Sequence, residues 1–173
     1  MIAREAIVAA ARGWFGTPYH HQASVKGVGC DCLGLIRGLW RELLGDEPET
    51  LPAYTRDWGD ATGSEPLLAV ARRHLLPLAS VDLAQPGDML VFRMQAGVAK
   101  HAGILSALPA TSEALSRGAL LERNGLLERD GLYERGGKFI HAVEELGVTE
   151  VALTRWWRRR LVAAFSLPNI ASC

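Results

Sequence analysis

The sequence predicts an α+β fold, because helical patterns fill its first half and short strand patterns fill its second half, without βαβ alternation. The chain has 173 residues, a length that fits one domain spanning residues 1–173. Apolar residues make up 49% of the chain and charged residues 22%, which is typical of a folded protein. We therefore expect a single domain with a core of its own.

Three helices are expected in the first half. Residues 2–14 place apolar side chains at helical spacing. The second helix begins at Cys32, with Asp31 as its N-cap, and Gly45 stops it. Residues 66–76 form a third, shorter helix that starts with a proline. On the second helix, Cys32 lies in the first turn and on the apolar face, which we expect to pack inward.

Five short strands are expected in the second half, at residues 89–93, 100–106, 138–143, 149–153 and 159–165. A six-residue repeat lies between the second and the third of them, at 119–136. Asn-Gly, Asp-Gly and Gly-Gly pairs stand at its junctions and favour tight hairpin turns. We interpret 107–137 as an inserted flap or docking arm, and a repeat expansion that forms a tolerated surface loop is the alternative.

Charge and hydropathy argue against nucleic acid and membrane as partners. Nineteen Lys and Arg residues balance nineteen Asp and Glu residues, so no overall field attracts a polyanion. The basic run Arg155–Arg160, which holds two tryptophans, is expected to be an edge strand with a solvated face, or a protein contact. Nowhere do about 18 uncharged apolar residues run together, as a membrane helix requires. We expect no direct nucleic-acid binding and no membrane insertion.

The N-terminal residues do not have the pattern of a signal peptide. Charges appear at Arg4 and Glu5, and the apolar run Ala6–Ala11 is short. We therefore expect the chain to be made in the cytoplasm without a signal peptide. Any work outside the cytoplasm then requires delivery by another agent.

The cysteines are Cys30, Cys32 and Cys173. An odd number, with two of them only one residue apart, does not make a disulfide framework. A Cys-x-Cys pair supplies two of the four ligands that a structural zinc needs, so we expect no metal and no cofactor. A reactive thiol or a buried one remains, and we interpret Cys30 as structural.

Cys32 is the candidate nucleophile. A helix N-terminus and a neighbouring imidazolium each lower the pKa of a thiol, and first-turn N–H groups can hold an oxyanion. His101 and His141 both lie in predicted strands, where they could serve as a base and its orienting group. Taken alone, each of these residues is more often structural, and it is their combination that favours a catalytic site.

Five short motifs occur in order: Gly16-Thr-Pro-Tyr19, Gly29-Cys-Asp-Cys-Leu-Gly34, Gly87-Asp88, His101-Ala-Gly-Ile104 and Ile140-His-Ala142. This ordered signature resembles the NlpC-type cell-wall cysteine peptidases. With the ending Trp157–Pro168, it resembles more narrowly the branch found with tail genes of phages and phage-like gene transfer agents. The resemblance covers most of residues 1–168 and leaves out 107–137.

The resemblance implies a papain-like α+β fold and assigns roles to the three candidate residues. Cys32 would attack the scissile carbonyl. His101 would take the thiol proton and later protonate the leaving amine, and His141 would orient His101. The implied substrate bond is the γ-D-glutamyl to diaminopimelate link of peptidoglycan.

Three further residues are implied to contact substrate. Tyr19 resembles a tyrosine that lines the cleft and supports the oxyanion. Asp31 matches an acidic residue that meets the free amine of a stem peptide in relatives. Leu33 stands where the family pattern usually has a serine, so the selectivity for stem peptides is open.

The function implied is a peptidoglycan endopeptidase carried on the tail of a phage or phage-like particle. It would act in the periplasm to open the cell wall for DNA, with tail-hub or baseplate proteins as partners. Two alternatives stay open. One is a structural tail-hub or baseplate component with weak or no activity, and the other is an amidase or acyltransferase of the same fold.

Overall fold

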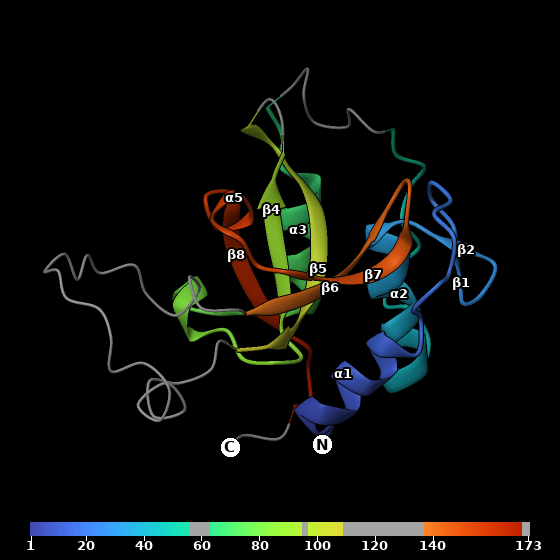
Figure 1. The fold of residues 1–173 in the computed structure, drawn as a ribbon, viewed down its shortest axis with the longest axis horizontal. Helices are drawn as coiled ribbons and strands as arrows, with labels where there is room; N and C mark the ends of the chain where they lie inside the picture. The colour runs from blue at the N-terminus through green and yellow to red at the C-terminus, as the bar shows by residue number, and fades with distance from the viewer. Residues whose placement is uncertain (56–62, 95–96, 109–136, 171–173) are drawn as a thin grey trace, which may run out of the picture.

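A six-stranded antiparallel sheet forms the centre of the part of the chain that the computed structural model describes, residues 1–55, 63–94, 97–108 and 137–170 (Figure 1). Its strands lie side by side in the order β3 (Leu76–Pro77), β8 (Leu161–Ser166), β4 (Met89–Arg93), β5 (Ala99–Ala107), β6 (Lys138–Val143) and β7 (Gly147–Ala152). A separate hairpin consists of β1 (Ser24–Val25) and β2 (Gly29–Cys30).

The helices precede most of the sheet in the sequence, which confirms the predicted α+β class. They are α1 (Arg4–Arg12), α2 (Cys32–Leu44), α3 (Pro66–His74), the 3₁₀ turn η1 (Val81–Leu83) and α5 (Arg155–Arg158). The third helix was predicted to reach Leu76 but ends at His74. Leu75 is extended, and Leu76 pairs with Ser166 of β8 instead of continuing the helix.

Side chains of the sheet alternate between two hydrophobic clusters, as the two-residue period of a strand requires. Met89 and Val91 of β4 pack with the helices on one face. Leu90 and Phe92 pack on the other face, where no residue of α1, α2 or α3 joins the cluster within the described chain. The near-continuous burial of β4 therefore follows from a sheet that is covered on both faces.

The interpretation of Arg155–Arg160 as an edge strand is wrong. Residues 155–158 form the short helix α5, and β8, which follows it, lies inside the sheet between β3 and β4. The helical turn places the two tryptophans differently. Trp157 packs against the second cluster, whereas Trp156 stays 48% exposed, with the Arg160 guanidinium 3.7 Å from its ring centroid. In a strand, these two neighbouring side chains would point to opposite faces of the sheet.

The predicted arm at 107–137 lies largely outside the described residues. The strands that flank it, β5 and β6, are neighbours, and Ala107 is paired with Lys138. The chain therefore leaves the sheet and returns to it at adjacent positions.

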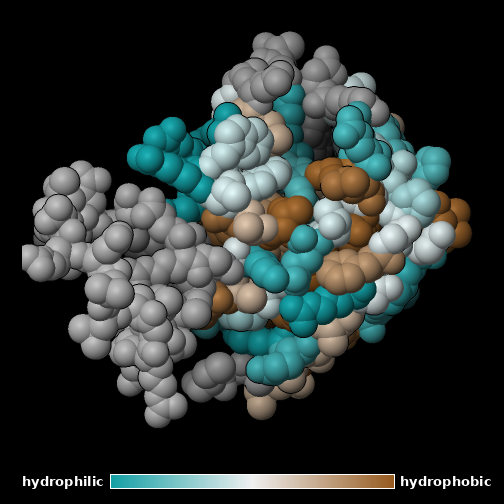
Figure 2. Space-filling model, in the orientation of Figure 1, coloured by the Kyte–Doolittle hydropathy of each residue, from teal (hydrophilic) through white to brown (hydrophobic). Residues whose placement is uncertain are grey.

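The described surface mixes hydrophilic and hydrophobic residues, as the composition leads one to expect. On the face shown in Figure 2, hydrophilic residues surround smaller patches of hydrophobic ones. None of the helices in the described ranges is long and apolar enough to cross a membrane.

Asp88 joins α1 to the sheet, and its replacement is expected to destabilise the fold. The carboxylate is fully buried and accepts hydrogen bonds from Arg4 Nη1 at 2.7 Å, Ser166 Oγ at 2.6 Å and the N–H of Gln85 at 2.7 Å. Asp88→Asn removes the charge that pairs with Arg4 and should lower the free energy of unfolding by about 3 kcal/mol. Urea denaturation measures it, with exposed Asp82→Asn as the control, expected to change stability by less than about 0.5 kcal/mol. A similar small loss for both variants would contradict this role.

Candidate active site

The helix that carries Cys32 begins where the sequence predicts. Asp31 has an extended backbone, and its Oδ1 accepts a hydrogen bond of 2.7 Å from the N–H of Gly34. A carboxylate at this position satisfies one of the donors that the first turn leaves without an intrahelical acceptor. The predicted N-cap and the predicted first-turn position of Cys32 are therefore confirmed.

His101 on β5 and His141 on β6 form a hydrogen-bonded pair. Nε2 of His101 lies 2.8 Å from Nδ1 of His141, and the two ring planes are 81° apart. Gly103 keeps the space between the strands open, because a Cβ there would stand 2.7 Å from the carbonyl oxygen of Ile140 and 3.2 Å from Cβ of His141. The hydrogen bond engages Nε2 of His101 and leaves its Nδ1 as the nitrogen that can act as a base.

The thiol and the base line one cleft, which has a volume of about 200 Å³. It is lined by Tyr19, His21, Asp31, Cys32, Tyr54, Thr55, Met94, Lys100, His101, Ala142 and Glu144. His141 lies behind His101 and is 2% exposed. In this structure the Cys32 thiol donates a hydrogen bond of 3.8 Å to the backbone oxygen of Lys100, so proton transfer to His101 requires the thiol to leave that acceptor.

Removal from water favours the neutral forms of the thiol and both imidazoles, although Cys32 and His101 at the cleft are only partly buried and His141 alone is fully buried. Desolvation raises the pKa of Cys32 to about 12, assisted by the neighbouring Asp31 carboxylate and opposed by backbone hydrogen bonds. Burial likewise lowers the pKa of His101 to about 3, assisted by His141, and the pKa of His141 to about 4. The expectation of a thiol pKa lowered by the helix N-terminus is therefore wrong, because desolvation of the thiolate outweighs the favourable field of the helix.

Asp31 is the centre of a hydrogen-bonded cluster rather than an open carboxylate. It is 3% exposed, and its Oδ2 accepts hydrogen bonds from the Tyr54 hydroxyl at 2.6 Å and the N–H of Gln22 at 2.7 Å. His21 Nδ1 lies 3.5 Å from the same oxygen. The cluster ties the loop before α2 and the segment around Tyr54 to the start of the helix. These hydrogen bonds occupy much of the carboxylate that was predicted to meet a substrate amine.

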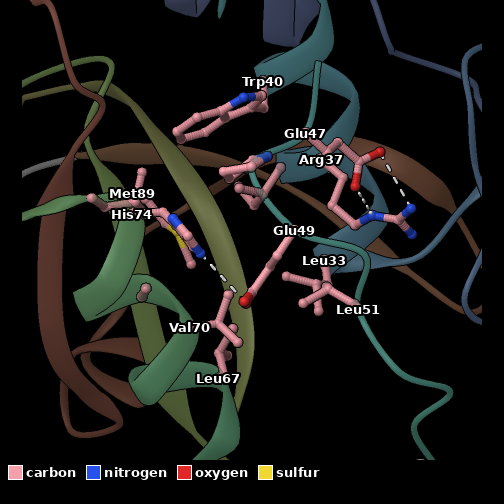
Figure 3. A pocket seen from close by; sticks show the side chains of 14 residues that line it. Leu33, Arg37, Trp40, Glu47, Glu49, Leu51, Leu67, Val70, His74 and Met89 are labelled. Carbon is pink, nitrogen blue, oxygen red and sulfur yellow. Dashed lines mark hydrogen bonds and ion pairs between the residues drawn. The ribbon is translucent and has the colours of Figure 1, made fainter. Parts of the chain in front are cut away.

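The structure separates the other two predicted substrate residues. Tyr19 lines the cleft with Cys32 and is bridged to Cys30 of β2. Leu33 instead lines a second, apolar pocket of about 60 Å³ between α2, α3 and the segment 47–51. Figure 3 shows Leu33 beside Leu51 in that pocket. At the position where the family pattern has a serine, this chain therefore places an apolar side chain in the core.

Sequence reasoning missed several residues of the cleft. Tyr54, Lys100 and Glu144 line it but belong to no recognisable motif. His21, from the loop before Cys32, also lines the cleft. No sequence pattern predicts that Tyr54 lies in the cleft, because its place depends on the path of a segment that forms neither helix nor strand. Trp157 was assigned to a surface strand, although its ring packs against both histidines.

The arrangement is suited to attack on a carbonyl carbon. A thiol at a helix N-terminus faces the same cleft as an imidazole, and a second imidazole is hydrogen-bonded to the first. Within the described ranges, no group of three or more His, Cys, Asp or Glu side chains could hold a metal ion. The residue types and their placement are those that a thiol nucleophile, a base and backbone N–H donors for an oxyanion require.

Solved structures of similar shape place this site in a known fold. The crystal structure of the NlpC/p60 domain of peptidoglycan hydrolase SagA matches with a TM-score of 0.53 and 21% identity, covering 96% of this chain and 100% of that one. The chain has the NlpC/p60 fold. The predicted papain-like α+β architecture is confirmed by this match.

Two further NlpC/p60 structures agree. NlpC2 from Trichomonas vaginalis matches with a TM-score of 0.55 and 15% identity over 95% of this chain. A lipoprotein-like NLP/P60 protein from Staphylococcus aureus matches with a TM-score of 0.51 and 21% identity over 98% of this chain. The match covers 46% and 42% of those two chains, respectively. No family model matches the sequence, and no curated protein does.

Proposed function

We propose that this chain is a cysteine peptidase that hydrolyses amide bonds in the stem peptides of peptidoglycan. The observation that carries the proposal is the meeting of Cys32 and the His101–His141 pair in one cleft of an NlpC/p60 fold. SagA, which shares the fold, is a peptidoglycan hydrolase. The proposed bond is the γ-D-glutamyl to diaminopimelate link, on the strength of the sequence motifs around these residues.

The first chemical step transfers the thiol proton as the sulfur attacks. Nδ1 of His101 accepts the proton from Cys32 while Sγ bonds to the scissile carbonyl carbon, because the resting pair is neutral. The hydrogen bond from His101 Nε2 to His141 Nδ1 holds the imidazole in the required tautomer and stabilises the imidazolium that forms. His101 then protonates the leaving amine, and water hydrolyses the thioester.

The oxyanion of the tetrahedral intermediate is held at the start of α2. The backbone N–H of Cys32 lies in the first turn, where no intrahelical acceptor competes for it. Tyr19 lines the same cleft and is the proposed second donor, through its hydroxyl.

We propose delivery by the tail of a phage or phage-like particle, with hub or baseplate proteins as partners and the periplasm as the place of action. The support is the sequence resemblance of the ending Trp157–Pro168 to the tail-associated branch. A particle that opens the wall locally would need an enzyme of this kind near its tip.

Product analysis tests the proposed function. The purified chain is incubated with diaminopimelate-type peptidoglycan, and the released peptides are identified by mass spectrometry. Peptides with new diaminopimelate amino ends are expected from the wild-type protein, and they should be absent when the Cys32→Ala protein is used instead. Release of the whole stem peptide would indicate an amidase. No release by the wild-type protein would contradict the proposal.

A further inference from the structure

Trp157 touches every part of the histidine pair. Its ring centroid lies 5.4 Å from that of His101 with the planes 25° apart, so the two rings are stacked. It lies 5.2 Å from that of His141 with the planes 88° apart. One indole therefore contacts both imidazoles of the hydrogen-bonded pair.

The indole is itself fixed by the sheet. Phe92 of β4 and Phe139 of β6 meet it at centroid distances of 5.1 Å and 5.0 Å. Both phenylalanines are fully buried. A side chain held from two strands in this way has little freedom to move away from the histidines.

Nε2 of His141 is a buried polar atom beside the indole. This atom has no hydrogen-bond partner among the described residues. When His101 donates from Nε2 to His141 Nδ1, the proton of His141 resides on Nε2. A perpendicular pair of rings is an arrangement in which an N–H group can point at an aromatic face.

We propose that Trp157 is a positioning residue that excludes water from the His101–His141 hydrogen bond and thereby keeps the base lone pair on Nδ1 of His101. Without the indole, water can hydrate both imidazoles and compete for the donor on His101 Nε2. The alternative tautomer, with a proton on Nδ1, could not accept the thiol proton. The other titratable groups that line the cleft beside His101 are Cys32 and Asp31 at the start of α2, Lys100 on β5, Glu144 after β6, and Tyr19, His21 and Tyr54.

The test follows the imidazoles directly, by NMR titration of protein with ¹³C-labelled histidine. In Trp157→Ala, hydration of His101 and His141 should raise their pKa values by on the order of one unit. Trp157→Phe should keep the wild-type titration, because it keeps an aromatic ring over the pair. Trp156→Ala is the control: Trp156 is 48% exposed and does not line the cleft, although its ring meets Trp157 at a centroid distance of 4.7 Å, and its loss should leave both histidines unchanged as long as Trp157 stays in place. Unchanged titration in folded Trp157→Ala would overturn the proposal.

A second variant covers the case in which Trp157→Ala does not fold. Trp157→Leu keeps an apolar side chain but fills less space than the indole, so water entry should still raise the pKa of His141 above that in Trp157→Phe. Equal titration in the Leu and Phe variants and the wild type would overturn the proposal. A kinetic measurement, which rests on the proposed function, should show a roughly tenfold lower kcat with KM unchanged in Trp157→Ala and Trp157→Leu, and wild-type values in Trp157→Phe. The NMR result stands whether or not peptidoglycan is the substrate.

Discussion

Replacing Cys32 by alanine is expected to abolish hydrolysis while leaving the fold almost as stable as before. Without the sulfur there is no nucleophile, so turnover should fall by at least about a thousandfold. Cys32 is only partly buried, and its one hydrogen bond is a long one to the backbone of Lys100. The free energy of unfolding should therefore change by less than about 1 kcal/mol. Peptide release from peptidoglycan and urea denaturation measure the two quantities.

Cys30→Ala is the matched control, because it removes the same atom two residues away. Cys30 is fully buried in the core between helices and sheet, so its loss should cost about 1 kcal/mol or more in stability. Activity should be largely retained. A Cys32→Ala protein that still cleaves, or a Cys30→Ala protein that is folded and inactive, would contradict the assignment of the nucleophile.

The helix that carries Cys32 and the strands beside it could be predicted from local sequence. The N-cap at Asp31 and the glycine at position 45 define the limits of α2 within a few residues, and each acts on its immediate neighbours. The strands β4 and β6 have the bounds that the alternation and turn residues predict. These local sequence patterns were therefore enough to predict that Cys32 lies in the first turn of a helix and that both histidines lie in strands.

Features that depend on distant neighbours could not be predicted. Trp157 turns back onto His101 and His141 because a short helix, and not a strand, precedes β8. Tyr54 reaches Asp31 across 23 residues of sequence. Neither contact has a sequence period, since each depends on how a connecting segment crosses the fold.

The protonation state of the site was also beyond the sequence. A helix N-terminus does favour a thiolate, and that argument led to the expectation of a lowered pKa for Cys32. The structure adds the burial and the Asp31 carboxylate, both of which raise that pKa. Competing effects of this kind can be weighed only when the depth of each group is known.

The buried histidine pair is expected to make the fold acid-sensitive well above the range in which carboxylates titrate. An unfolded histidine takes up a proton near pH 6.5, whereas burial lowers the folded pKa of His101 to about 3 and of His141 to about 4. Between these values the unfolded state binds more protons than the native state. Stability conferred by the pair is complete above about pH 6.5 and is lost as the pH falls, by up to about 1.4 kcal/mol per pH unit for each histidine.

Urea denaturation between pH 7 and pH 4.5 measures this loss. Hydrogen bonds and charges of their arginine partners lower the pKa values of the Glu47, Glu65 and Glu150 carboxylates despite partial burial, which keeps their protonation away from this window. His141→Gln should reduce the slope by on the order of 1 kcal/mol per pH unit. Exposed His20→Gln removes an imidazole from the surface and should leave the slope as it is. Equal slopes for wild type and His141→Gln would mean that folding does not lower the pKa of His141, and the acid sensitivity expected of the pair would be contradicted.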